Sequence, residues 1–181
     1  STTVRYLING AVHIHFIPIF VWKGLSPQVG ANFVGVTAFV ATPLILAVGA
    51  MGDRWSKRLI LMSGHLSHMV SLLVLVYSDG IRPLYLFAVL FSYGEGVSPV
   101  NYSILGEYFG RKVFATLKGS LSTFTTLSMV SPIFTGWVYD NTESYTGALL
   151  TFAGLAGLAA VVLLFLVPPK KAAPVPSASN L

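Results

Sequence analysis

One carboxylic acid stands out because of its position in the chain. Glu95 lies near the middle of an otherwise apolar stretch that runs from about residue 83 to 105. A charged side chain at the centre of a membrane helix costs at least about 2.5 to 3.5 kcal/mol, so it is expected to face a cavity, a partner or a proton. A protonatable Glu95 at this depth predicts a substrate-binding or proton-coupling site. The alternative is a structural carboxyl group that a hydroxyl from a neighbouring helix holds.

Polar side chains surround Glu95 along the same stretch. Helical spacing places four residues on its face: Ser92, Ser98, Pro99 and Tyr102. Glycines on either side of Glu95 and the nearby proline are expected to loosen the helix and free backbone groups. We therefore interpret Tyr93, Asn101 and Tyr102 as candidate substrate contacts beside Glu95.

A second polar stripe lies in the first apolar stretch. Tyr6, Asn9 and His13 fall at i, i+3 and i+7, which is one helix face, whereas His15 points elsewhere. Because residues two apart are about 200° apart around a helix, His13 and His15 cannot readily share a metal ion. Asn9, His13 and His15 are candidate substrate contacts, and ordinary hydrogen bonding between helices is an equal alternative for both histidines.

Nothing else in the sequence indicates catalysis. Serine-hydrolase, nucleotide-binding and zinc-protease motifs are absent, and no pattern predicts nucleic-acid binding. The chain has no cysteine, which excludes disulfides and thiolate metal sites. We expect no metal, no cofactor and no enzymatic activity.

The composition indicates that the solvent of this chain is a lipid bilayer. Hydrophobic residues make up 54% of the 181 residues, charged residues only 9%, and the mean hydropathy is +0.75. A water-soluble domain carries about a quarter charged residues. The expected fold is therefore an all-α membrane protein.

Six apolar windows are long enough to cross a bilayer, which takes about 20 residues. They cover roughly residues 4–22, 29–51, 59–77, 83–105, 120–139 and 145–167. We expect residues 1–169 to form one six-helix bundle and residues 170–181 to form a disordered cytoplasmic tail. Because the chain starts at Ser1 without a signal sequence, a preceding segment is also expected.

Basic residues predict the orientation of the bundle. Nine of the 11 Lys and Arg residues fall on one side of the six spans, and only Lys23 and Arg82 fall on the other. Cytoplasmic loops are enriched in Lys and Arg. Both termini are therefore predicted to be cytoplasmic, in a multi-pass protein of the plasma membrane.

A charged loop separates the second and third spans. Its residues Gly49, Asp53, Arg54, Lys57 and Arg58 match the Gly-x-x-x-Asp-Arg-x-x-Arg/Lys-Arg/Lys pattern, which resembles the loop found in each half of major facilitator superfamily transporters. The resemblance implies a gating loop that stabilises the outward-open state. The alternative is a basic loop that only sets orientation.

Two later strings extend the resemblance over nearly the whole chain. The first is Glu107, Tyr108, Phe109, Gly110 and Arg111, and the second is Gly136, Trp137, Val138, Tyr139 and Asp140. Both are similar to the C-terminal half of monocarboxylate and oxalate:formate-type carriers. The resemblance implies that the spans are the seventh to twelfth helices, with the first and fourth beside the central cavity and the third, which carries His65 and His68, peripheral.

The resemblance implies a secondary active transporter of small organic solutes, with monocarboxylates as candidate cargo. Its partners would be the lipid bilayer, a small-molecule substrate, and an N-terminal six-helix half or a second copy. Arg5 is placed at the mouth of the cavity, so the cation that an anion requires is expected in the other half. The alternatives are a non-transporting subunit or receptor-like protein, and an intramembrane enzyme in which Glu95 and the histidines converge.

Overall fold

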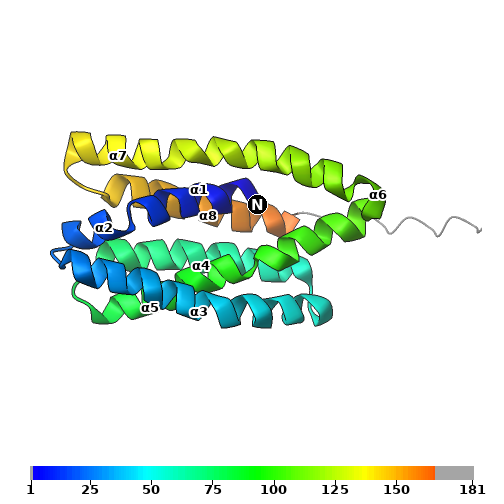
Figure 1. Ribbon diagram of the computed structural model, residues 1–181, viewed down its shortest axis with the longest axis horizontal. Helices are drawn as coiled ribbons and strands as arrows, with labels where there is room; N and C mark the ends of the chain where they lie inside the picture. The colour runs from blue at the N-terminus through cyan, green and yellow to red at the C-terminus, as the bar shows by residue number, and fades with distance from the viewer. Residues whose placement is uncertain (1, 166–181) are drawn as a thin grey trace, which may run out of the picture.

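The computed structural model describes residues 2–165, except the side chains of residues 105, 108–115, 117, 124, 125 and 127. The described chain folds into helices that run along a common long axis, without a strand (Figure 1). The all-α fold is confirmed. The expected tail at residues 170–181 lies outside the described residues.

The first predicted span is a bent pair of helices. α1 (Thr2–Ile14) and α2 (Phe16–Trp22) meet at His15 with a bend of 63°. Pro18 has no N–H to donate to the carbonyl of Ile14, so the helix breaks at this point. Together the two helices are long and apolar enough to form one broken span.

Three further helices are each long and apolar enough to cross a membrane: α3 (Pro27–Arg54), α4 (Lys57–Tyr77) and α8 (Thr146–Phe165). They correspond to the second, third and sixth predicted spans. By length and composition, the described residues thus contain three membrane-crossing helices, or four with the bent pair.

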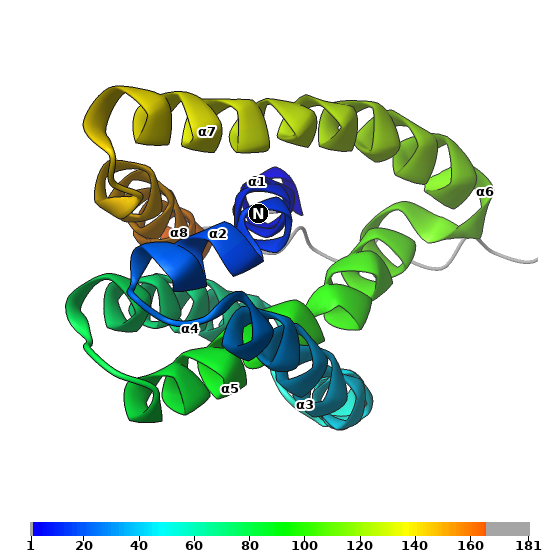
Figure 2. The same ribbon diagram turned by 60° about the vertical axis from the view of Figure 1, so that its left-hand side comes forward.

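The fourth and fifth predicted spans are divided differently from the expectation. α5 (Arg82–Gly96) ends in the middle of the fourth span, and α6 (Ser98–Thr126) continues through the segment expected to be a loop. The expected fifth span comprises the end of α6, the 3-10 turn η1 (Leu127–Met129) and α7 (Val130–Thr142). Figure 2 shows α6 turning back at the end of the bundle, so a bent helix makes the connection.

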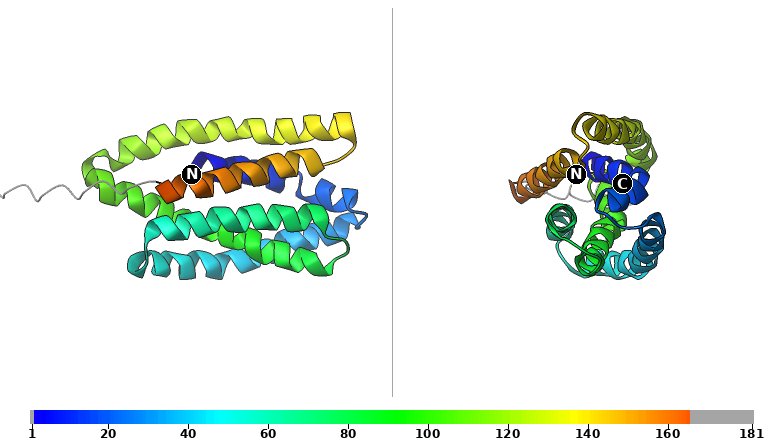
Figure 3. Two further views of the ribbon diagram at one scale, coloured as in Figure 1. Left: turned by 180° about the vertical axis from the view of Figure 1, so that it is seen from behind. Right: turned by 90° about the vertical axis from the view of Figure 1, so that its left-hand side faces the viewer.

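The core lies where α4 packs against α5 and α8, and α3 packs against α5. It contains aromatic rings packed against one another, the stacked pair Phe16 and Phe20 and the tilted pair Phe87 and Phe91, all at most 2% exposed. Seen from behind, α8 lies between α7 and α4 (Figure 3). Large apolar side chains such as Phe39 and Ile133 are exposed on the outside, which suits contact with lipid.

The turns gather at two ends of the bundle. The α3–α4 turn and the bend of α6 lie at one end, and the α2–α3, α4–α5 and α7–α8 turns lie at the other (Figure 1). The first end carries Arg54, Lys57 and Arg58, whereas the second carries Lys23 and Arg82. These five basic residues thus lie at the end that their predicted group requires.

Candidate functional site

A buried polar cluster joins α1, α4 and α5. It consists of Arg5, Asn9, His68 and Glu95. Nδ2 of Asn9 donates a hydrogen bond to Oε2 of Glu95 at 2.6 Å, and Nη1 of Arg5 lies 3.8 Å from the same oxygen. Nε2 of His68 lies 3.3 Å from the other carboxylate oxygen, Oε1. One carboxylate therefore faces a cation, an amide and an imidazole from two other helices.

Helix geometry explains how these side chains meet. Arg5 and Asn9 are four residues apart on α1, so they project from one face on successive turns. Glu95 is 13 residues beyond Arg82, which starts α5, and a helix rises about 1.5 Å per residue, so Glu95 lies about 20 Å from that end. The cluster is thus far from the end of the bundle where α5 begins, and it lies next to the break between α5 and α6.

A glycine lets α4 approach α5 at this point. A Cβ atom on Gly94 would lie 2.5 Å from Cε1 and Nδ1 of the His68 ring, closer than atoms can pack. The ring also meets Phe91 edge-on, with centroids 5.3 Å apart. His68 is fully buried. Gly94 therefore provides the space that brings the imidazole to Glu95.

Several polar atoms of the cluster have no hydrogen bond within the described part of the chain. They are Nη2 of Arg5, Oδ1 of Asn9, Oε1 of Glu95, and both ring nitrogens of His68. Nε2 of His68 and Oε1 of Glu95 nevertheless lie within ion-pair distance of each other. Buried polar atoms are nearly always paired, and exceptions concentrate at functional sites or at sites of water and ions. These unpaired atoms can form hydrogen bonds with a small polar ligand or accept a proton.

A second layer of contacts links α1 to α6 next to the cluster. The hydroxyls of Tyr6 and Tyr102 are 2.8 Å apart, and Asn101 donates to Oγ1 of Thr2 at 2.6 Å. The guanidinium of Arg5 also lies 4.8 Å from the centroid of the Tyr6 ring. The predicted stripe on the first span thus meets the predicted face around Glu95 through two pairs, Asn9 with Glu95 and Tyr6 with Tyr102.

The remaining candidate contacts lie apart from the cluster. The Tyr93 hydroxyl is 2.8 Å from Oγ of Ser63 on α4. His13 is exposed and meets Phe91 edge-on, while His15 sits at the α1–α2 break, with Nε2 3.0 Å from the carbonyl oxygen of Pro132. The structure therefore does not bring all seven candidates together.

Two members of the cluster were not among the predicted site residues. Arg5 was expected at the mouth of the cavity, but it is 4% exposed and faces Glu95. His68 was expected to have a packing role on a peripheral helix. The spacing of Arg5, Asn9 and His13 at i, i+4 and i+8 was a signal that could have identified Arg5. No comparable pattern marked His68, because its approach depends on the missing side chain of Gly94.

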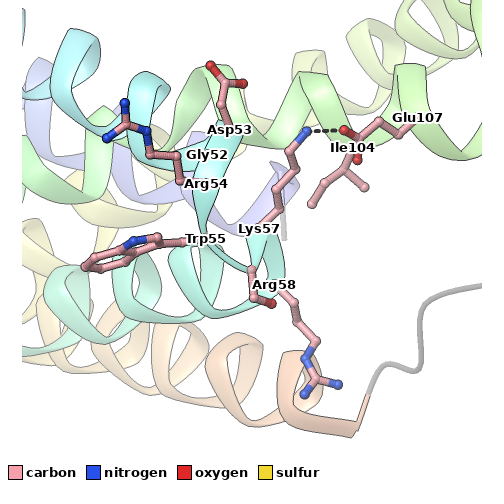
Figure 4. A pocket seen from close by; sticks show the side chains of 9 residues that line it. Gly52, Asp53, Arg54, Trp55, Lys57, Arg58, Ile104 and Glu107 are labelled. Atoms are coloured by element: carbon pink, nitrogen blue, oxygen red, sulfur yellow. Dashed lines mark hydrogen bonds and ion pairs between the residues drawn. The ribbon is translucent and has the colours of Figure 1, made fainter.

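The charged turn at the end of the bundle is a separate region. α3 continues to Arg54, so only Trp55 and Ser56 connect it to α4. Beside this turn is a pocket of about 280 Å³. Figure 4 shows Lys57 reaching Glu107 of α6, with which it forms an ion pair, while Arg54 and Arg58 point away from that pair. Asp53 is exposed at the pocket.

The glycines at this end differ in how much space surrounds them. A Cβ on Gly52 would lie 2.8 Å from a methyl group of Val100 on α6, whereas one on Gly49 would meet its nearest atom, in Pro99, at 4.0 Å. Close packing between α3 and α6 therefore depends on Gly52, which stands at an unspecified position of the predicted loop pattern, and not on Gly49.

The described histidines and acidic residues do not gather in one place. No group of three or more His, Asp or Glu residues there is arranged to hold a metal ion. One histidine, His68, approaches Glu95, while His13 and His15 have other neighbours.

Comparisons with known proteins identify the family. Searches of curated proteins and of solved structures found no match to the chain. A family model described as Major Facilitator Superfamily matches residues 3–180, nearly the entire sequence. This family points to a multi-pass membrane transporter rather than an enzyme. The chain therefore belongs to the Major Facilitator Superfamily.

Proposed function

We propose that this chain is the C-terminal half of a secondary active transporter of small organic anions, with monocarboxylates as candidate cargo. One observation carries the proposal: Arg5 is buried beside Glu95 and Asn9, with Nη2 of Arg5 and Oδ1 of Asn9 unpaired among the described residues. A buried guanidinium suits carboxylates because its planar donors match their two oxygens. The similarity to monocarboxylate and oxalate:formate-type carriers supports the same cargo class.

Charge balance explains how such a site couples anion binding to a proton. While Glu95 is ionised, it offsets the charge of Arg5 and competes with an incoming anion. A proton on Glu95 removes that competition and leaves Arg5 available to the anion. Arg5, Asn9 and Glu95 act as the substrate and coupling site, and Tyr6 and Tyr102 form its wall towards α6.

Alternating access supplies the transport step. Six-helix halves of such carriers rock around a central site, and the site opens to each side in turn. A ligand shifts this equilibrium only through contacts that differ between the two states. The bundle would pair with an N-terminal six-helix half or with a second copy, and the buried polar cluster would face that partner. The protein would lie in the plasma membrane with both termini on the cytoplasmic side. Gly49, Asp53, Arg54, Lys57 and Arg58 would form the gate on the cytoplasmic side.

Uptake into proteoliposomes tests the proposal. The full-length protein is offered a panel of labelled organic acids with and without a proton gradient, beside its Glu95→Gln form. Glu143→Gln is the matched control, because Glu143 is exposed in the α7–α8 turn and undergoes the same chemical change. We expect gradient-driven uptake in the parent and control, and its loss in Glu95→Gln.

Two results would contradict the proposal. Equal gradient-driven uptake in the parent and in Glu95→Gln would remove Glu95 from the coupling site. No uptake of any acid in the panel by the folded parent would reject the organic-anion cargo and favour a non-transporting subunit.

A further inference from the structure

We propose that His68 is the proton partner of Glu95, and that Gly94 is the residue that positions it. The proposal rests on the proposed function, because it assigns a residue to the coupling site. Three observations support it: the 3.3 Å separation of Nε2 and Oε1, the complete burial of His68, and the absence of space for any side chain at position 94.

Packing alone does not account for this histidine. Leaving a buried polar atom without a hydrogen bond is costly, and Nδ1 of His68 has no such bond among the described residues, while Nε2 faces the carboxylate of Glu95. A leucine or methionine at position 68 would fill the same space against Phe91 of α5 without that penalty. An imidazole next to a carboxylate can accept a proton, which leucine and methionine cannot do.

The proton step balances within the pair. With the ring hydrogen on Nδ1, the lone pair of Nε2 faces Oε1 of Glu95. The proton on the Glu95 carboxyl group then moves to Nε2, giving a carboxylate and an imidazolium. While the proton is on Nε2, the carboxylate is stabilised by Arg5 and Asn9. In the reverse step the proton returns from Nε2 to Oε1, which restores the neutral imidazole and the carboxyl group.

Few other charged or titratable groups act on this pair. Arg5 faces Glu95 from α1, the charge of His13 reaches Glu95 without a contact, and His65 lies one turn before His68 on α4. From α6, the nearest is Tyr102, whose hydroxyl is engaged by Tyr6. α8, which packs on α4, has no titratable side chain, and the charged residues of α3 are at its far end. The proton exchange is therefore local to His68 and Glu95.

Infrared difference spectroscopy over a pH series tests the proposal without transport. The carbonyl band of the protonated Glu95 is assigned in the full-length protein by its loss in Glu95→Gln. His68→Gln keeps a hydrogen-bonding side chain that cannot titrate. We expect this variant to move the titration midpoint of the Glu95 band by about one pH unit or more, which corresponds to about a tenfold change in the proton equilibrium.

Gly94→Ala tests the positioning role with the histidine still present. It should move the Glu95 midpoint as His68→Gln does, because the added methyl group displaces the ring. The matched control is Gly154→Ala on α8, where a Cβ would meet nothing within 4 Å, and its midpoint should equal that of the parent. An unchanged midpoint in folded His68→Gln overturns the proposal, as does an unchanged midpoint in Gly94→Ala.

Uptake measurements separate this proposal from the proposed function. In His68→Gln we expect no stimulation of uptake by a proton gradient, whereas Gly154→Ala should keep the stimulation of the parent. Stimulation in His68→Gln equal to that of the parent would overturn the role of His68. The parent protein could instead show a Glu95 midpoint that depends on His68 but transport no organic acid. That result would contradict the proposed organic-anion substrate and still support the proton exchange between His68 and Glu95.

Discussion

In the described part of the chain, opposite charges meet between helices in two regions, and these regions differ in burial. In the buried polar cluster, the side chains of Arg5 and Glu95 are 5% and 20% exposed. At the charged turn, those of Lys57 and Glu107 are 16% and 55% exposed. Charges removed from water are costly unless they are paired, whereas exposed pairs contribute little to stability.

The contrast indicates a different role for each region. A buried charge cluster with unpaired atoms is a poor way to stabilise a bundle that already has an aromatic core, so ligand or proton binding is the better explanation for it. The charged turn lies at a solvent-facing end, where pairs form and break at small cost. Such pairs suit a gate that opens in each transport cycle.

The largest expected effect follows from breaking the buried pair. Arg5→Met leaves the Glu95 carboxylate buried without its cation, and we expect a loss of about 3 to 5 kcal/mol in the free energy of unfolding. Thermal unfolding of the detergent-solubilised protein measures the change. The double variant with Glu95→Gln should recover most of the loss. Unchanged stability in Arg5→Met would contradict the claim that breaking the buried ion pair costs more free energy of unfolding than breaking the exposed one.

A glycine pair tests what holds the charged end together. Gly52→Ala places a methyl group against Val100, and we expect it to destabilise the protein by about 1 to 3 kcal/mol through overpacking. Gly49→Ala, one turn earlier on α3, has room for a methyl group and should be neutral or stabilise by up to about 1 kcal/mol. Urea titration of both variants measures the difference. Equal effects would mean that α3 and α6 do not depend on close packing here.

Periodicity and hydropathy predicted the helical fold and the ends of the apolar helices well. Both signals are local, and α3, α4 and α8 are continuous apolar runs that depend little on context. The segment around α6 was expected to be a loop because it carries glycines and charges. Its backbone nevertheless continues the helical bonding, with the turn made by bending. A local signal cannot distinguish a polar loop from a polar bent helix.

The candidate site was predictable only where a single helix carried the signal. Asn9 and Glu95 each stood out within an apolar run, and the structure places them in contact. The neighbours of Glu95 on other helices depended on how α1 and α4 are rotated, which no periodicity within α5 determines. Arg5 was therefore assigned to the mouth and His68 to a peripheral position.

The hydrogen bond between Tyr6 and Tyr102 is partly buried, so its burial lies between that of the buried polar cluster and that of the charged turn. Tyr102→Phe removes one hydroxyl from a partly buried bond, and we expect a loss of about 0.5 to 1.5 kcal/mol in the free energy of unfolding. Tyr85→Phe, which changes a 52% exposed tyrosine on α5, is the matched control and should leave stability unchanged. Denaturant titration of the two variants compares them. A larger loss for Tyr85→Phe would contradict the importance of the link between α1 and α6.

The smallest effect is expected at the charged turn, where a double-mutant cycle isolates the ion pair. Lys57→Ala, Glu107→Ala and the double variant should give a coupling energy of less than about 1 kcal/mol, because both side chains are partly solvated. The coupling should weaken further as salt is raised, since exposed charges are screened over about 10 Å at 0.1 M ionic strength. A coupling above about 2 kcal/mol that is insensitive to salt would place this pair with the buried cluster. It would also argue against a gate at this turn, because so strong a contact would hold α4 and α6 together throughout the transport cycle.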